Sequence, residues 1–145
     1  NDDSLTIDNC GIFSISNGNA NTNNVIHSGF LNISCGNLDI DGNYTANGHI
    51  TANISGGTIK VEGNWTSSGS GFDPTGGTVE LNGGADQALS MNASSNFFNL
   101  TVNNSSYDVD PSTNVAVTGA LTVTAGELDT AITIKMNIGI ESKTK

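Results

Sequence analysis

Cys10 and Cys35 are the only cysteines of this 145-residue chain, and a disulfide bond is the first chemistry they suggest. A long internal repeat aligns LTIDN (5–9) with LTVNN (100–104) and residues 24–39 with residues 114–129, and it matches the two cysteines to Ser105 and Ala125. If the spacing between Ser105 and Ala125 is one structural repeat, the two Cα atoms fall within the ~4.4–6.8 Å that a disulfide spans. We therefore expect a Cys10–Cys35 bond in a secreted chain, with two unpaired buried thiols as the alternative.

The side chains that could bind a metal ion are few. Two Asp-x-Asp pairs have a spacing that could place calcium between neighbouring segments: Asp39 with Asp41, and Asp108 with Asp110. Neither pair belongs to a complete calcium-loop motif, so we expect no cofactor, with calcium as the minor alternative. The histidines, His27 and His49, show no metal-binding spacing, and we interpret them as ordinary strand or surface residues.

Asparagine side chains offer sites for glycosylation. Asn-x-Ser/Thr sequons begin at eight positions, Asn32, Asn43, Asn53, Asn64, Asn92, Asn99, Asn103 and Asn104. A chain this rich in Asn, Ser and Thr produces several such triplets by chance, and several of them fall in repeated turns where Asn suits the backbone. Modification is therefore the lesser interpretation.

Two aromatic residues could contact a sugar. Tyr44 and Trp65 occupy the same place in two similar segments, GNYTANG (42–48) and GNWTSSG (63–69). Side by side they could form a surface for a glycan. The alternative, which we favour, is that they pack on each other at a turn.

The repetition of these segments predicts the fold. LDIDGNYTANG (38–48) aligns with IKVEGNWTSSG (59–69), and GGTIKVEG (56–63) aligns with GGTVELNG (76–83). Apolar pairs recur with the same period: Leu38/Ile40, Ile59/Val61, Val79/Leu81, Leu100/Val102 and Leu121/Val123. A fixed period with short alternating strands indicates an all-β solenoid with coils of about 20–21 residues.

A solenoid also explains the low apolar content of 35%, against about 45–50% in typical globular chains. Only inward positions of each coil need be apolar, and about seven coils stacked at ~4.8 Å would give a rod roughly 33 Å long. One conflict concerns the register of residues 31–38. The long repeat pairs Leu31 with Leu121, whereas the short period pairs Leu38 with Leu121.

The charge of the chain excludes several partners. The net charge is −10, arginine is absent, and Lys60 is the only lysine before Lys135. Such a chain repels nucleic acids and anionic membranes, and no segment is apolar enough to insert into a bilayer. The outward residues of the repeated pairs include Asp39, Lys60 and Glu80, which predicts a solvated charged face.

The motifs GGTVELNG, FFNLTVN and VTGALTVTAGELD, within residues 24–130, resemble the repeats of very large secreted bacterial β-solenoid proteins. These include surface adhesins broadly like filamentous haemagglutinin and autotransporter passengers. The resemblance implies a right-handed parallel β-helix, an extracellular or cell-surface location and a non-catalytic role. The usual handedness of parallel crossovers agrees with it.

We therefore expect one solenoid domain over residues 1–145. It would consist of disulfide-stapled coils at 1–35, regular coils at 36–130 and an irregular end at 131–145. The expected function is structural: a surface or adhesin segment, or a filament subunit that stacks end to end on itself or on flanking repeats. The first alternative is a glycan-binding module, and the second is a carbohydrate-active enzyme. An enzyme is disfavoured because basic residues and aromatic residues that could contact a sugar are scarce.

Overall fold

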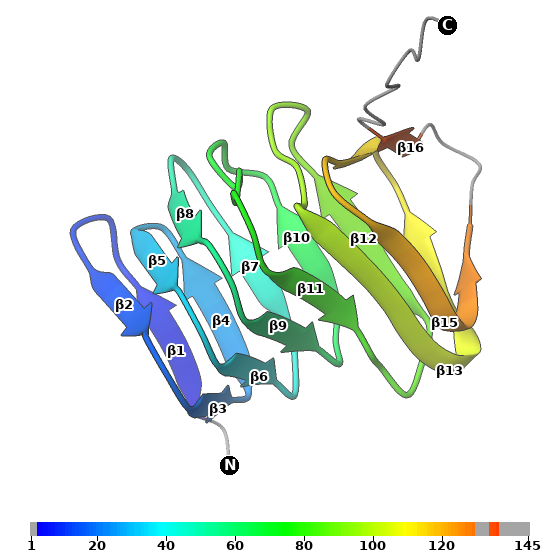
Figure 1. The fold of residues 1–145 in the computed structure, drawn as a ribbon, viewed down its shortest axis with the longest axis horizontal. Coiled ribbons are helices and arrows are strands. Elements are labelled where there is room, and N and C mark those ends of the chain that lie inside the picture. Colours follow the sequence, from blue (N-terminus) through cyan, green and yellow to red (C-terminus); the bar gives the residue numbers. More distant parts are fainter. Residues whose placement is uncertain (1–2, 130–133, 137–145) are drawn as a thin grey trace, which may run out of the picture.

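The fold is a stack of short parallel β-strands wound into a solenoid of about six turns (Figure 1). This is a computed structural model, and it describes residues 3–129 and 134–136. Every regular element of these residues is a strand, as the repeat predicts. Each regular turn has three sides, which we call the first, second and third face in the order in which the chain visits them.

The first face is a parallel sheet whose strands come one from each turn. It contains β1 (Ser4–Ile7), β4 (Asn24–His27), β7 (Tyr44–Ala46), β10 (Trp65–Ser67) and β12 (Gln87–Met91). Each strand pairs with the next in this order, so equivalent residues of successive turns lie side by side.

The third face continues into the first through one long strand. It contains β3 (Asn19–Thr22), β6 (Asn37–Ile40), β9 (Thr58–Val61), β11 (Thr78–Leu81), β13 (Asn99–Pro111) and β15 (Leu121–Leu128). The start of β13 pairs with β11, and its end pairs with β12 of the first face. One sheet of 11 strands therefore covers both faces.

The second face is less continuous. Its first three strands, β2 (Ile12–Ile15), β5 (Phe30–Ile33) and β8 (Thr51–Ile54), form one sheet, and β14 (Val115–Val117) and β16 (Ile134–Met136) form another. Between these two sheets the described part of the face contains isolated bridges, His49 with Ser70 and Phe97 with Val117.

The predicted ladder of apolar pairs is confirmed. Leu38, Ile59, Val79, Leu100 and Leu121 are paired in this order on the third face, and Ile40, Val61, Leu81, Val102 and Val123 follow beside them. The register conflict is resolved in favour of the short period. Leu31 lies instead on the second face, between Phe13 and Ala52.

Coil length varies, which makes the long repeat wrong as a structural register. Phe30 lies beside Ile12, and Leu89 lies beside Trp65, so the second of these turns takes up a longer stretch of chain than the first. The long repeat therefore matches segments of similar composition that belong to different faces. Leu5, for example, lies on the first face, whereas its repeat partner Leu100 lies on the third.

The core is a narrow column of inward side chains from all three faces. In the second turn Val25, Leu31 and Leu38 are each 0% exposed, because turns on both sides cover them. Their equivalents in the first turn are only partly buried. The predicted irregular end, residues 131–145, lies outside the described residues except for β16.

Glycine is required where turns stack most closely. Gly36 has a φ of +95°, and a Cβ atom there would lie 2.0 Å from the carbonyl oxygen of Gly18 in the turn before. Gly57 repeats this arrangement over Gly36, with a φ of +74° and 2.3 Å to the carbonyl oxygen. Any side chain would clash with backbone, so the corner between the second and third faces depends on glycine in successive turns.

Candidate functional site

Tyr44 and Trp65 do not form a glycan site. Both side chains are 0% exposed and point into the core, where their rings stack 3.9 Å apart with an angle of 14° between the ring planes. They do lie on neighbouring turns in equivalent positions, as predicted. The packing of one ring on the other is therefore confirmed, although the two residues lie in strands β7 and β10 and not at a turn. The glycan-contact hypothesis for these two residues is wrong, because neither side chain is exposed.

The aromatic pair belongs to a larger buried cluster that includes a histidine. Phe72 and Phe97 pack edge-on against Trp65, with ring centroids 4.9 and 5.2 Å from it. His27 is 0% exposed, and its Nδ1 lies 2.7 Å from the hydroxyl of Tyr44. His27 Nε2 lies 3.1 Å from the carbonyl oxygen of Gly29.

These partners fix the state of His27. The Gly29 carbonyl can only accept, so Nε2 carries the proton and donates, while Nδ1 accepts from the Tyr44 hydroxyl. Burial lowers the pKa of His27 from 6.5 to about 4, although the backbone bond opposes this. Burial also raises the pKa of Tyr44. The interaction is structural, since neither group reaches solvent.

The predicted Cys10–Cys35 disulfide is absent, and both cysteines are exposed free thiols. Cys10 lies in the turn between β1 and β2, whereas Cys35 lies between β5 and β6. These are different corners of the solenoid, separated by the second face. Four residues of strand extend about 13 Å, beyond the ~7 Å that a disulfide can bridge. The prediction failed because it used the long repeat, whereas the register of the strands places Cys35 beside Asn17.

The two Asp-x-Asp pairs lie at different strands of the solenoid. Asp39 points outward from β6 beside Lys60, and Asp108 and Asp110 belong to the end of β13. Among residues 3–129 and 134–136, no three His, Cys, Asp or Glu side chains gather as a metal site would require. The calcium alternative stays an untested prediction.

The sequons differ sharply in accessibility. Asn43, Asn53, Asn64 and Asn103 are exposed, Asn32, Asn92 and Asn99 are half-buried, and Asn104 is 0% exposed. Asn104 donates from Nδ2 to Ala85 and Gln87, so its amide nitrogen cannot accept a glycan in the folded protein. Modification at the other positions stays a prediction.

Gln87 and Asn104 form a buried polar network that the sequence did not reveal. Gln87 Nε2 donates to the carbonyl oxygens of Val61 and Gly63, and its Oε1 accepts from the Gly83 amide and from Asn104 Nδ2. The network fills the corner between the third and first faces in the turn that follows β11. Its only signal in the sequence was a Gln at an inward strand position.

Replacing Gln87 should therefore weaken the fold. Gln87→Leu keeps most of the volume but leaves buried donors and acceptors without partners, and we expect a loss of about 2 kcal/mol in the free energy of unfolding. Urea denaturation followed by circular dichroism would measure it. Ser90→Ala, on the outward side of the same strand, is the control and should change stability by under about 0.5 kcal/mol. Equal effects of the two changes would contradict the role given to the network.

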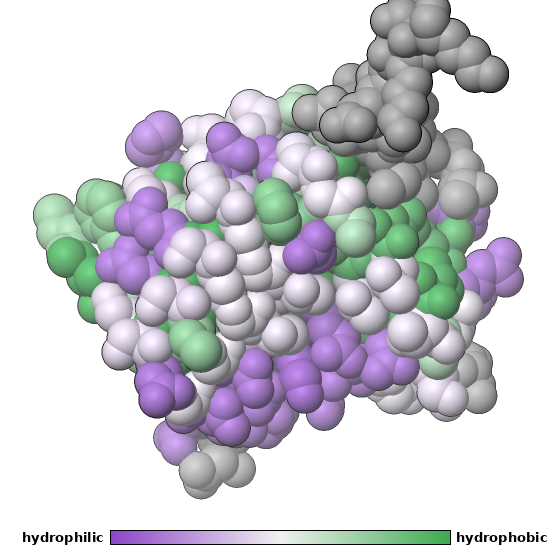
Figure 2. Space-filling model, in the orientation of Figure 1, coloured by the Kyte–Doolittle hydropathy of each residue, from purple (hydrophilic) through white to green (hydrophobic). Residues whose placement is uncertain are grey.

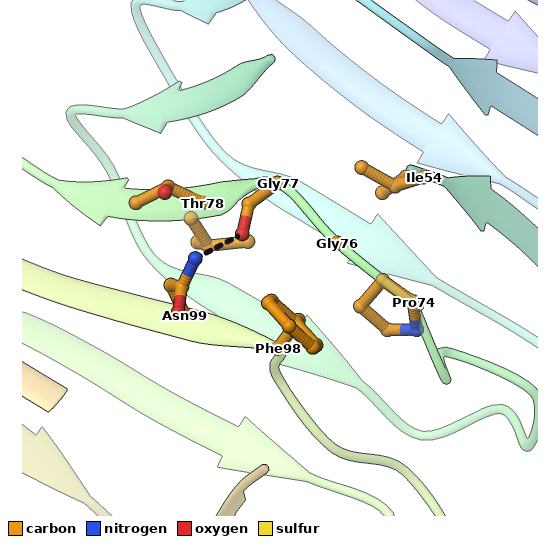
Figure 3. A pocket seen from close by; sticks show the side chains of 8 residues that line it. Ile54, Pro74, Gly76, Gly77, Thr78, Phe98 and Asn99 are labelled. Carbon is orange, nitrogen blue, oxygen red and sulfur yellow. Dashed lines mark hydrogen bonds between the residues drawn. The ribbon is translucent and has the colours of Figure 1, made fainter. Parts of the chain in front are cut away.

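Two hollows lie on the surface of the described residues. Figure 3 shows one between Ile54, Pro74 and Phe98, where Asn99 Nδ2 donates to the Gly77 carbonyl oxygen. This hollow is too small to hold a water molecule, so we interpret it as a gap in the packing. A second hollow, on the third face, is polar and is lined by Asn21, Asp39, Ile40, Asp41, Lys60, Glu62 and Asn82. In Figure 2 hydrophilic side chains gather along the lower part of the molecule, where Figure 1 shows β3, β6 and β9 of the third face.

The first turn presents the strongest candidate for an interface, which we call the open coil. Strands β1, β2 and β3 each pair with one neighbour, β4, β5 and β6, so their other edges offer unpaired backbone groups within the described chain. The inward residues Leu5 and Phe13 are only partly buried, and Ile12 beside them is 69% exposed. Apolar side chains are visible at this end of the molecule, beside β2 (Figure 2).

Comparison with protein-family models, with curated proteins and with solved structures finds no match to this chain. The described residues contain no helix of the length and apolar character needed to cross a membrane. The parallel β-solenoid architecture therefore rests on the repeat and on the strand register.

Proposed function

We propose that this protein is a non-catalytic extracellular structural element, a β-solenoid segment that lengthens a rod by accepting a further parallel coil on its open coil. The adhesin-like resemblance of the repeats supports an extracellular location and a role at the cell surface. The observation that carries the proposal is the combination of three unpaired strand edges with half-covered core residues at the same turn.

The chemistry of this end favours another coil over other partners. Unpaired backbone groups on an edge strand are satisfied by a new strand, and three edges in one turn need three strands together. A solenoid coil provides them in one piece, with inward apolar residues that would cover Leu5, Phe13 and Ala20. Head-to-tail stacking between copies would not close on itself, so it would give filaments.

The test is electron microscopy with light scattering over a concentration series of the purified protein. We expect rods that lengthen with concentration at constant width. Leu5→Asp/Phe13→Asp should shorten them, because charges at half-covered inward positions cannot be buried by a stacked coil. Ser4→Asp/Ser14→Asp adds the same charge to the outward side of the same strands and should leave the rods unchanged. Single particles at every concentration would contradict stacking between copies.

A further inference from the structure

The outward side of the first face carries no charged side chain from β1 to β12, although the chain has a net charge of −10. Its outward strand residues are Ser4, Thr6, Asn24, Ile26, Thr45, Thr66, Ala88 and Ser90. The uncharged stretch ends at Asp110 of β13, which lies beside Ala88. On the third face, by contrast, the outward positions of three successive turns are Asp39, Lys60 and Glu80. Charge is therefore distributed unevenly around the solenoid, and these five strands present a polar surface without charge.

Hydroxyl groups recur along this face at the spacing of the turns. Thr45 lies beside Thr66, and Thr66 lies beside Ser90, so neighbouring hydroxyls are about 4.8 Å apart along the stack. Thr6 belongs to the same row, with Ile26 between it and Thr45. Within the part of the chain that the structure describes, none of these hydroxyls has a hydrogen-bond partner. Each can donate and accept toward a ligand.

An adjacent row of amides is held in one orientation. The backbone amide of Asn43 donates to Asn24 Oδ1 at 2.9 Å, and that of Asn64 donates to Asn43 Oδ1 at 2.8 Å. The amide of Ala88 then donates to Asn64 Oδ1 at 2.8 Å. Side chains fixed in this way lose little entropy when a ligand binds, so the row is preorganised.

We propose that this uncharged array on the first face binds a neutral polysaccharide. A polymer of sugar units offers hydroxyl groups at regular intervals, and several weak hydrogen bonds along one rigid surface add up to useful affinity. The absence of charge selects against polyanions and polycations, which need opposite charges for binding. The proposal does not depend on end-to-end stacking, because the array lies on the side of the solenoid.

The experiment is a sedimentation assay with insoluble neutral glycans, microcrystalline cellulose and β-1,3-glucan particles, and with alginate gel beads as the anionic comparison. We expect the protein to bind at least one neutral glycan and not alginate, with little change between low and high salt, because no ion pairs are involved. Thr45→Glu/Thr66→Glu should reduce the apparent affinity about tenfold or more, and a tenfold loss corresponds to ~1.4 kcal/mol.

Thr101→Glu/Thr122→Glu is the matched control. These two residues are also neighbours on adjacent turns and point outward, but from the third face. This variant should bind as the unmodified protein does, and thermal melts should show both variants folded. The proposal is overturned if no neutral glycan is bound above an albumin control, or if both double variants lose binding equally. It is equally overturned if Thr45→Glu/Thr66→Glu binds unchanged.

Discussion

Trp65→Ala is expected to lower the free energy of unfolding by about 3–5 kcal/mol, the range for removing a large buried aromatic side chain. Trp65 is 0% exposed and stacks on Tyr44 at 3.9 Å, and its Nε1 donates to Met91 Sδ at 3.1 Å. Phe72 and Phe97 contact the same ring edge-on. The backbone around the cavity is tied to the turns on both sides, so the walls cannot collapse to fill it.

Urea denaturation followed by far-ultraviolet circular dichroism would measure this change, since Trp65 is the only tryptophan and its fluorescence disappears with it. Thr66→Ala is the control: its side chain points outward from the same strand, and its cost should stay below about 0.5 kcal/mol. A loss below about 1 kcal/mol for Trp65→Ala would show that the ring does not hold neighbouring turns together. Because solenoids can unfold in parts, a second probe should confirm a single transition.

The strands of the third face could be predicted from sequence because their pattern is complete. In Leu38–Asp39–Ile40 and its repeats, large apolar side chains stand on both sides of a polar one, so the inward and outward positions are unambiguous. The turns after the first three of these strands contain a glycine, Gly42, Gly63 and Gly83, which marks where each strand ends. Period, register and fold class followed from these two features.

The first face could not be predicted as well, because its inward side chains are not all apolar. In β7 and β10 a large aromatic residue is followed two positions later by Ala46 or Ser67, and in β4 the inward partner of Val25 is His27. A polar or small residue at an inward position hides the alternation. The sequence therefore predicts that Tyr44 and Trp65 lie side by side on neighbouring turns, but not that both side chains point into the core.

Corner residues were the least predictable, because coil length changes from one turn to the next. The turn that leads from Ile12 to its neighbour Phe30 is shorter than the turn that leads from Trp65 to its neighbour Leu89. An insertion of a few residues at one corner leaves every strand in register, so the strand pattern does not record it. This is why the disulfide was misplaced, and why the Gln87 network in a lengthened corner gave no clear signal.

Acidification should destabilise the fold through His27. Its pKa is about 4 in the folded protein, below the 6.5 of an exposed histidine, so the unfolded chain takes up the proton first. The contribution of neutral His27 is therefore complete above pH 6.5 and is lost as the pH falls to 4. This difference between the pKa of His27 in the folded protein and in the unfolded chain corresponds to about 3 kcal/mol in the free energy of unfolding. The cause is burial beside the Tyr44 hydroxyl and the Gly29 carbonyl, with no acidic partner to stabilise an imidazolium among its contacts in the described chain.

Carboxylates titrate over the same range, so the measurement must compare variants. His27→Gln keeps a donor for the Gly29 carbonyl and an acceptor for the Tyr44 hydroxyl but cannot titrate. Between pH 7 and pH 4 it should lose about 3 kcal/mol less stability than the unmodified protein. His49→Gln, which changes an exposed histidine beside Ser70, is the matched control for replacing a histidine by glutamine. If His27→Gln and the unmodified protein lose stability equally, His27 does not stay neutral in the fold and the hydrogen-bond assignment fails with it.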